Sequence, residues 1–390
     1  MTAQDAEATP GSRRSPLISD VIAVMDQLYP STAAMDWDVV GLAVGSPRVP
    51  VTKIFFTVDV TSSIVAEAAE ASAELIIAHH PVLLRGISAL TDDHPKGRLV
   101  RELVRHDISV FVAHTNADVA AGGVAWALAD ALELTGCRPM LPAALALDKI
   151  ITFVPNDHAE AVLDALATAG AGVLGDYDRC AFVSDGSGTF RPLAGSSPYL
   201  GTAGVIETVP ERRIEMIMPR GARSAVVQAL LKAHPYQTPA YDVIELAESP
   251  DPDVGLGRIG TLTGELTVGG LADRLAAVLP ATAGGVRIGG DLDRVVHTVA
   301  VLPGSGDDLL ETAHALGADA YLTCDLRHHR ASEALAWPNA PALIEISHWA
   351  AEWTWLPVVE RLLRTELAAA GLAVDTAISP LSTDPWQDRR

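Results

Sequence analysis

The strongest constraint on the fold comes from residues 75–81 (LIIAHHP), where an apolar run stops at two adjacent histidines. A short aliphatic run of this kind is typical of a fully buried strand. Pro81 cannot continue a central strand, because it has no N–H group to donate to a neighbouring strand. The sequence therefore predicts that His79 and His80 lie at the end of a buried strand, where they can act as metal ligands.

Neighbouring side chains of an extended strand point to opposite sides, so His79 and His80 are poorly placed to bind one ion together. Each histidine can instead bind one of two adjacent ions. The alternative is a pair of ordinary loop histidines, at least one of them satisfied by hydrogen bonds. These seven residues alone do not decide between the two interpretations.

Strands and helices alternate on both sides of this stretch, with short connections between them. Before it we expect a helix capped by Ser19, a turn-rich segment at residues 36–45, a strand at residues 53–58 and a helix at residues 62–73. After it we expect a helix at residues 97–106 and a strand at residues 109–113. This alternation predicts an α/β fold, a three-layer core with a mainly parallel sheet.

Polar residues of the ligand type follow three of these predicted strands. Asp59 follows the first, His79 and His80 follow the second, and residues 114–118 (HTNAD) follow the third. Binding sites in open α/β sheets form at the carboxyl ends of the strands. The three strand ends therefore predict one shared site.

The order of elements changes near residue 145. Strands are predicted at residues 150–154, 181–184, 213–218 and 241–246, helices at residues 157–169 and 222–233, and a glycine- and proline-rich stretch at residues 186–204. This order indicates a ferredoxin-like α+β domain inserted into the larger domain. Its polar residues show no metal-ligand spacing, so we expect a regulatory, assembly or substrate-covering module.

The larger domain is expected to resume near Gly255. Residues 255–260 (GLGRIG) lack the spacing of a dinucleotide-binding loop. A predicted strand at residues 295–302 runs into residues 303–308 (PGSGDD), which form either an anion site at a helix N-terminus or a plain tight turn. We accordingly expect a disordered tail at residues 1–15, the first half of a metal-binding core at 16–145, the insert at 146–248, the second half at 249–380 and a tail at 381–390.

Two further predicted strands also end in polar clusters. Residues 320–322 precede Asp325, His328 and His329, and residues 342–346 precede Ser347 and His348. His348 and Glu352 are four residues apart, so a helix starting near Ser347 places them on one face. Many helices carry this spacing without binding a metal, so the pair gains its weight from the other clusters.

Charge and cysteine content exclude several classes of function. With 49 acidic and 28 basic residues, the chain has a formal net charge of -21 at pH 7, which disfavours binding to nucleic acid or to anionic membranes. No run approaches the roughly 18 apolar residues of a membrane helix, and residues 1–15 lack the apolar core of a signal peptide. The three cysteines are widely spaced, so we expect a reduced protein in the cytoplasm.

The candidate ligands are imidazole nitrogens and carboxylate oxygens, which suit zinc, manganese, iron or nickel. A carboxylate is the natural bridge between two ions, and Asp118 is placed for that role. Two ions about 3.5–4 Å apart can lower the pKa of a bridging water molecule, which is the chemistry of hydrolysis.

Five segments carry a family resemblance: residues 37–42 (WDVVGL), 78–81 (AHHP), 114–118 (HTNAD), 323–325 (TCD) and 347–352 (SHWAAE). Together they resemble the NIF-three-like (NGG-interacting-factor-three-like) family of dinuclear metal-centre proteins, often labelled GTP cyclohydrolase 1 type 2 homologues. Residues 170–172 (GAG), 175–177 (GDY), 188–190 (GTF) and 234–236 (HPY), with Cys180, resemble the inserted domain of longer bacterial members, which is similar to PII and CutA modules.

The resemblance implies a set of metal ligands and a surrounding pocket. Its ligands for two divalent ions are His79, His80, Asp118, His348 and Glu352, with Asp118 as the bridge. Asp59, His114, Asp325 and His328 or His329 are implied to line the same pocket. The sequence departs from the family pattern at Val39, where asparagine is usual, and at Cys324 and Ser347, where glycine is usual; none of these changes removes a ligand.

The resemblance also implies a homo-hexamer, built as a trimer of dimers, that acts on a small molecule. We expect a metal-dependent hydrolase, because five protein ligands over two ions leave positions for water. The alternative is a non-catalytic metal chaperone or regulatory protein whose insert senses a ligand. A role in binding DNA or a transcription partner is disfavoured by the charge.

Overall fold

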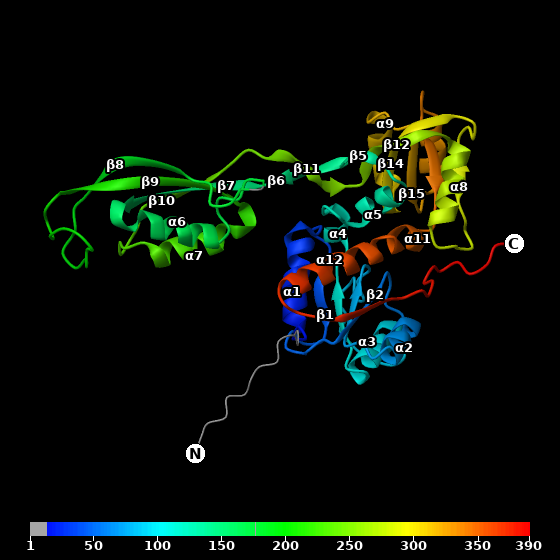
Figure 1. Ribbon diagram of the computed structural model, residues 1–390, viewed down its shortest axis with the longest axis horizontal. Helices are drawn as coiled ribbons and strands as arrows, with labels where there is room; N and C mark the ends of the chain where they lie inside the picture. Colours follow the sequence, from blue (N-terminus) through cyan, green and yellow to red (C-terminus); the bar gives the residue numbers. More distant parts are fainter. Residues whose placement is uncertain (1–13, 176) are drawn as a thin grey trace, which may run out of the picture. The chain divides into compact units, whose positions relative to one another are not determined.

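The computed structural model describes residues 14–175 and 177–390 (Figure 1). Most of the expected N-terminal tail, residues 1–13, lies outside the described residues, as does Asp176 of the GDY motif. The chain divides into two compact units, one formed by Met1–Ala143 with Pro252–Arg390 and the other by Ala144–Asp251. None of the described helices is long and apolar enough to cross a membrane.

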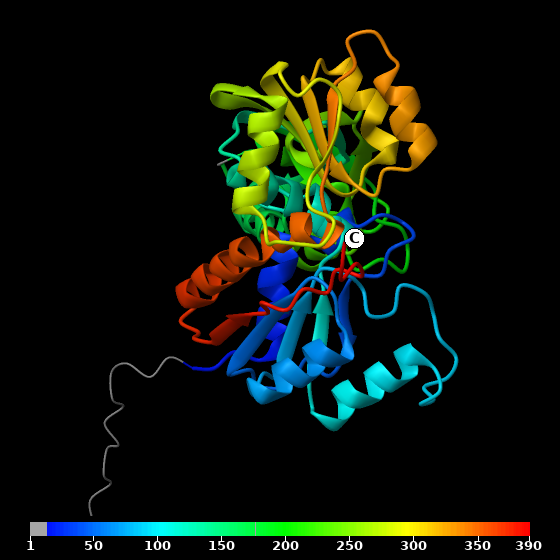
Figure 2. The same cartoon turned by 90° about the vertical axis from the view of Figure 1, so that its right-hand side faces the viewer.

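The first sheet of the larger unit carries the histidine pair. Its strands are β1 (Gly41–Val44), β2 (Lys53–Thr57), β3 (Leu75–Ala78), β4 (Ser109–Val112) and β17 (Asp375–Ile378), in the spatial order β1-β4-β3-β2-β17. All neighbours are parallel except β1, which is antiparallel to β4. Figure 2 shows β17, drawn in red, lying along the edge of the blue strands, although it comes from the opposite end of the chain.

Both faces of this sheet are covered. Strand β3 shows this, since it is apolar at every position and all four of its residues are buried. Leu75 and Ile77 pack with residues of α1 (Ile18–Leu28) and α12 (Trp355–Ala369). Ile76 and Ala78 pack on the other face with residues of α2 (Ser62–Glu70) and α3 (Pro95–Arg105). Burying each such aliphatic side chain stabilises the fold by about 1.5–3 kcal/mol, which fixes the position of the histidines that follow.

The second sheet of the larger unit lies in the C-terminal half. Its strands are β5 (Thr135–Arg138), β12 (Arg258–Thr267), β13 (Arg287–Gly289), β14 (Val295–Ser305), β15 (Ala320–Cys324) and β16 (Ala342–Glu345), in the order β13-β16-β15-β14-β12-β5. The central strands β14, β15 and β16 are parallel. The helices of this half are α8 (Val268–Val278), α9 (Leu310–Ala315) and α10 (His328–Leu335).

Helix α11 (His348–Trp353) packs against both sheets of the larger unit. Trp349 and Ala350 belong to the core of the first sheet, whereas Ala351 belongs to the core of the second. The helix begins after β16, and the Ser347 side chain caps it by accepting a hydrogen bond from the Ala350 amide at 3.2 Å. The C-terminal half thereby delivers His348 and Glu352 to the ends of β3 and β4.

The smaller unit contains the strands β7 (Leu147–Pro155), β8 (Phe182–Phe190), β9 (Glu207–Pro219) and β10 (Tyr241–Glu245), in the order β10-β7-β9-β8. Every pair in this sheet is antiparallel. The helices α6 (Ala159–Thr168) and α7 (Arg223–Ala233) contribute Val162, Leu166, Val226 and Leu230 to its core. The segments that connect this unit to the rest of the chain include β6 (Leu141–Leu145) and β11 (Ser249–Leu256), which pair with each other.

The observed architecture confirms the predicted α/β class, with one difference in the smaller unit. We expected the strand to end near residue 184, before the glycine- and proline-rich stretch at residues 186–204, but β8 continues to Phe190. The glycines in this strand leave room for a neighbouring side chain, because a Cβ atom on Gly188 would lie 2.0 Å from Glu211 Oε2. Glycine here permits close packing within a strand and does not mark a loop.

Candidate metal centre

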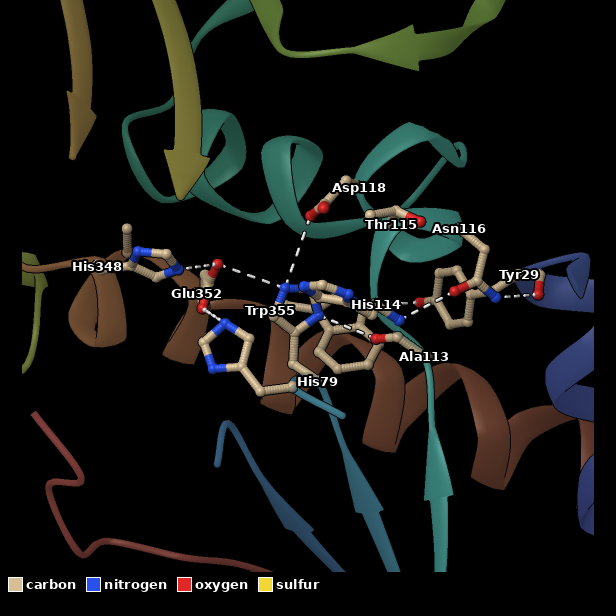
Figure 3. Close-up of polar contacts among 12 residues, drawn as sticks. Tyr29, His79, Ala113, His114, Thr115, Asn116, Asp118, His348, Glu352 and Trp355 are labelled. Carbon is tan, nitrogen blue, oxygen red and sulfur yellow. Dashed lines mark hydrogen bonds and ion pairs between the residues drawn. The ribbon is translucent and has the colours of Figure 1, made fainter. Parts of the chain in front are cut away.

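The candidate ligands converge from four segments of the larger unit. His79 and His80 follow β3, His114 follows β4, and Asp118 lies on the short helix α4 (Thr115–Val119). His348 and Glu352 lie on α11, four residues apart. Figure 3 shows Asp118 and Glu352 directed towards the side chain of His79, and His348 directed towards Glu352.

Every one of the four histidines has its Nδ1 atom engaged by an acceptor. His79 Nδ1 lies 2.9 Å from the carbonyl oxygen of Ala113, which can only accept, so this nitrogen carries the proton. The other three face carboxylates: His80 Nδ1 lies 2.7 Å from Asp59, His114 Nδ1 3.0 Å from Asp38, and His348 Nδ1 2.5 Å from Asp325. Outer partners of this kind orient metal-binding histidines and leave Nε2 for the ion.

Glu352 lies among three of the Nε2 atoms. Its Oε1 is 2.8 Å from His348 Nε2 and 3.4 Å from His79 Nε2, and its Oε2 is 3.0 Å from His80 Nε2. Its side chain is 4 % exposed. A carboxylate at this depth is stable only when positive charge surrounds it, and three histidines or bound cations meet that requirement.

Two overlapping groups of side chains have the spacing of a metal site. The potential ligand atoms of His79, His80 and His114 lie within 4.8 Å of one another, as do those of His80, His348 and Glu352. Within the described residues, His79 Nε2 is buried without a hydrogen-bond partner. Because Nδ1 of the His79 ring already donates a hydrogen bond, Nε2 of the neutral ring carries a lone pair that faces the site. The donor set therefore fits divalent cations.

The pKa values show how strongly the site favours positive charge. Burial alone would lower the pKa of His80, but Glu352 and Asp59 outweigh it and raise the pKa to about 10. His348 follows the same pattern, with Glu352 and Asp325 raising its pKa to about 11 against burial. The pKa of Glu352 lies well below its usual value despite burial, because His79, His80 and His348 surround it.

Asp118 and His114 depart from this pattern. Burial, assisted by the negative charge of Glu352, raises the pKa of Asp118 to about 6, although His79 opposes the shift. Asp118 Oδ1 lies 3.7 Å from His79 Nε2. Burial and the neighbouring His79 lower the pKa of His114, so this imidazole is neutral near neutral pH and can bind a cation.

The segment that carries His114 is fixed from both sides. Asn116 accepts a hydrogen bond from the His114 amide at 2.9 Å and donates one to the Tyr29 carbonyl at 2.7 Å. Asp38, whose side chain is fully buried, also accepts hydrogen bonds from the amide and hydroxyl of Thr115 at 3.1 and 2.6 Å. The HTNAD motif therefore holds the imidazole as well as supplying it.

The residues expected to line the pocket differ in their distance from the candidate ligands and in their role. Asp59 orients His80 and also accepts a hydrogen bond from Thr383 at 2.5 Å, and Asp325 orients His348. His114 is a member of one potential ligand group, which sequence analysis had assigned only to the pocket. His328 and His329 are exposed at the start of α10, with their rings 5.3 Å apart, and neither belongs to the two ligand groups.

The sequence indicated no role for Asp38, although this residue lies in the WDVVGL motif.

The positions that depart from the family pattern do not occupy ligand positions. Val39 is 67 % exposed, and Cys324 is fully buried at the end of β15, where burial raises the pKa of its thiol. Gly304 has a φ of +80°, and a Cβ atom there would lie 3.3 Å from Glu352 Oε1, so glycine lets the backbone approach the site.

Comparison with known proteins shows the family of the chain. Residues 16–385 match the family described as Duf34/NIF3 (NGG1p interacting factor 3). The chain belongs to the DUF34/NIF3 family. The match covers the two sheets of the larger unit and the smaller unit between them, and it confirms the resemblance found in the sequence motifs.

Relatives within the DUF34/NIF3 family align along most of the chain. A Mycobacterium leprae protein named GTP cyclohydrolase 1 type 2 homolog is 42% identical over 372 residues, which cover 95% of this chain and 94% of the relative. A Bacillus subtilis protein of the same name is 41% identical over 316 residues, covering 81% of this chain and 84% of the relative. The crystal structure of a Bacillus cereus protein related to NIF3 superposes with a TM-score of 0.84 at 37% identity, covering 96% of this chain and 99% of the other.

Proposed function

We propose that this NIF3-family protein is a metal-dependent hydrolase that binds two divalent ions at the ends of β3 and β4. The ligands are His79, His80, Asp118, His348 and Glu352, with His114 beside them. The observation that carries the proposal is the shared orientation of four histidines, each with Nδ1 hydrogen-bonded outward. The donor set suits zinc, iron, manganese or nickel.

Bound divalent ions would supply Lewis acidity and lower the pKa of water, which is what hydrolysis requires. The protein's own residues prepare the site for this chemistry. Asp59 and Asp325 hold the imidazoles of His80 and His348 in place, and Asp38 does the same for His114. In the metal-free site burial raises the pKa of Asp118 to about 6, and bound cations would favour the ionised form that a ligand requires.

The name of the relatives supports a cyclohydrolase-type reaction on a small molecule. The proposal includes a homo-hexamer, a trimer of dimers, which family membership supports, and a location in the cytoplasm. The net charge of -21 supports the absence of nucleic-acid and membrane partners. The smaller unit is proposed to be a ferredoxin-like insert, which its β-α-β-β-α-β order and antiparallel sheet support. The core is proposed to be three-layered, which the apolar clusters on both faces of the first sheet support.

Hydrolysis of a panel of nucleotides and cyclic amides tests the enzymatic part of the proposal. The wild type would be assayed after removal of metal and after reloading with zinc, manganese, iron or nickel, beside Asp118→Ala and the exposed control His328→Ala. We expect turnover only with metal, loss of at least about 100-fold in Asp118→Ala, and no change in the control. Full metal binding without turnover of any substrate would instead favour the metal chaperone or regulatory protein.

A further inference from the structure

The smaller unit contains a cavity of about 610 Å³ that the metal chemistry does not use. It is lined by parts of β8 and β9, the segment after β8, and the residues that precede β10. The volume is within the usual range for sites that bind small molecules. Four aromatic side chains belong to its wall, Phe153, Phe190, Tyr199 and Tyr236, and the ring centroids of Phe190 and Tyr236 lie 5.8 Å apart.

One carboxylate is buried in this wall. Glu211 lies on β9 and is 7 % exposed. Its Oε1 accepts a hydrogen bond from the Tyr236 hydroxyl at 2.7 Å. In the described part of the chain, no hydrogen bond or ion pair involves its Oε2. Oε2 therefore keeps its lone pairs available for a donor from a ligand in the cavity that Glu211 lines.

The neighbouring backbone leaves space for this oxygen. A Cβ atom on Gly188 of β8 would lie 2.0 Å from Glu211 Oε2, so any larger residue would displace the carboxylate. Burial and Glu211 itself raise the pKa of the Tyr236 phenol, so the hydroxyl stays protonated. It donates a hydrogen bond to Glu211 Oε1. His234 holds Tyr236 in place by accepting its amide hydrogen at 3.1 Å.

The single basic side chain in the wall does not neutralise Glu211. Arg213 donates from Nε to Glu215 at 2.9 Å, and its guanidinium lies 5.9 Å from the centre of the Phe153 ring. The segment after β8 is tied down over the cavity, since Tyr199 Oη lies 2.9 Å from His158 Nε2 and the Ser197 amide donates to Gln237 at 3.1 Å. The cavity thus combines aromatic walls with one preorganised acceptor pair.

We propose that this cavity binds a small planar nitrogen heterocycle that presents two adjacent N–H donors to Glu211. Oε2 accepts one donor, and Oε1 accepts the second with the lone pair that Tyr236 does not use. The ring packs against Phe190 and Tyr236, which favours a flat aromatic ligand over an aliphatic amine. Guanine-type bases carry such an edge, whereas adenine-type bases do not.

Calorimetric titration of the full-length, metal-loaded protein with guanosine, inosine and adenosine tests this assignment. Guanosine offers two adjacent donors, inosine offers one, and adenosine offers none at the corresponding positions. We expect guanosine to bind at least about tenfold more tightly than adenosine, with inosine between them, because a hydrogen bond to a charged group is worth about 1.5–3 kcal/mol. Equal affinity for the three nucleosides, or binding of none, would overturn the proposal.

Variants place the ligand in this cavity. Glu211→Gln should weaken guanosine binding at least about tenfold, whereas Glu160→Gln, an exposed glutamate on α6 of the same unit, should not change it. His348→Ala should leave guanosine binding intact; loss of binding in this variant alone would locate the ligand at the metal centre and refute the proposal. Metal content and hydrolysis of the same samples separate a failure here from a failure of the proposed hydrolase.

A second substitution keeps the test decisive if Glu211→Gln does not fold. Phe190→Leu keeps an apolar side chain of similar size but removes the aromatic face. It should weaken guanosine binding several-fold while the thermal unfolding midpoint stays near that of the wild type. Unchanged guanosine affinity in a folded Phe190→Leu protein would contradict the proposed packing of the ring.

Discussion

At the scale of single residues, the site depends on the acceptors behind the histidines. Asp59 fixes the His80 ring through Nδ1 and is itself held by Thr383. Asp38 and Asp325 have the same relation to His114 and His348. Because these carboxylates set which nitrogen is free, we expect them to influence the affinity of the proposed metal site without touching the ion.

Replacing Asp59 with asparagine tests this dependence. We expect Asp59→Asn to lower zinc affinity by about 10–100-fold, because the amide removes the negative charge that raises the basicity of His80. Competition with a chromogenic chelator measures the change. The control is Asp92→Asn, an exposed aspartate paired with Arg101. Equal affinity in Asp59→Asn and the control would show that His80 needs no carboxylate partner.

The sequence pointed to the candidate ligands more directly than to the residues that orient them. His79-His80 after an apolar run, and His348 with Glu352 at helical spacing, are local patterns, and the structure brings all four together. The pairing of Asp38 with His114 joins residues 76 positions apart, and no local pattern reveals it. Likewise, Gly188 beside Glu211 appears in the sequence only as glycine in a loop-like stretch, since its purpose depends on the neighbouring strand.

At the scale of elements, helix α11 is the component that joins the second sheet to the site. Its first turn depends on Ser347, whose hydroxyl accepts from the Ala350 amide and donates to Asp384. Serine stands here where the resemblance found in the sequence implies glycine. Serine and glycine are both favoured at the N-cap position of a helix, whereas alanine is disfavoured there.

Substitutions at Ser347 should follow this ranking. We expect Ser347→Ala to lower the free energy of unfolding by about 1 kcal/mol and Ser347→Gly by only a few tenths. Urea unfolding followed by tryptophan fluorescence is suitable, because Trp349 and Trp353 lie on α11 itself. Equal losses for alanine and glycine would indicate that the Asp384 contact, rather than the cap, is what serine contributes.

Strand β7 of the smaller unit carries a second buried carboxylate. Asp148 is fully buried and accepts hydrogen bonds from Arg220 and Arg223 at 3.2 and 2.6 Å. The hydrogen bond from Arg223 is the main cause that lowers the pKa of Asp148 below its usual value. A carboxyl group whose pKa is lowered on folding stabilises the folded state above its unfolded pKa, and this contribution disappears as the pH falls through the folded pKa.

Asp148→Asn should therefore destabilise the smaller unit at neutral pH by about 1–2 kcal/mol. The difference from the wild type should shrink as the solution is acidified below the usual carboxyl pKa. This unit has no tryptophan, so hydrogen–deuterium exchange of β7 and β9 followed by mass spectrometry is the measurement. Asp185→Asn, an exposed control on β8, should exchange as the wild type does. A pH-independent difference would refute the ion-pair explanation.

At the scale of the whole molecule, the family match includes all of the candidate ligands. The match spans residues 16–385, and the candidate ligands lie at both ends of that span. Two halves of the core that are separated by about 100 residues of insert meet at this centre. The positive character of the metal-free cluster, with pKa values of about 10 for His80 and about 11 for His348, shows that bound cations would replace protons.

Metal binding should consequently release protons. The pKa values of His79, His80 and His348 are all raised in the metal-free site, so these imidazoles must lose protons before Nε2 can bind an ion, and we expect proton release on metal binding near neutral pH. The affinity for metal should rise with pH for the same reason. Zinc titrations by calorimetry, in two buffers with different ionisation enthalpies, measure the number released. No release would mean that these imidazoles are not ligands.

The most direct test of the two-ion centre is the metal content of the purified protein by elemental mass spectrometry. Wild type, His79→Ala and the exposed control His328→Ala would be compared after loading with zinc and removal of free ions. We predict about two ions per chain in the wild type and the control, with fewer in His79→Ala. Retention of no metal by the wild type, or equal content in all three proteins, would contradict the metal centre described above.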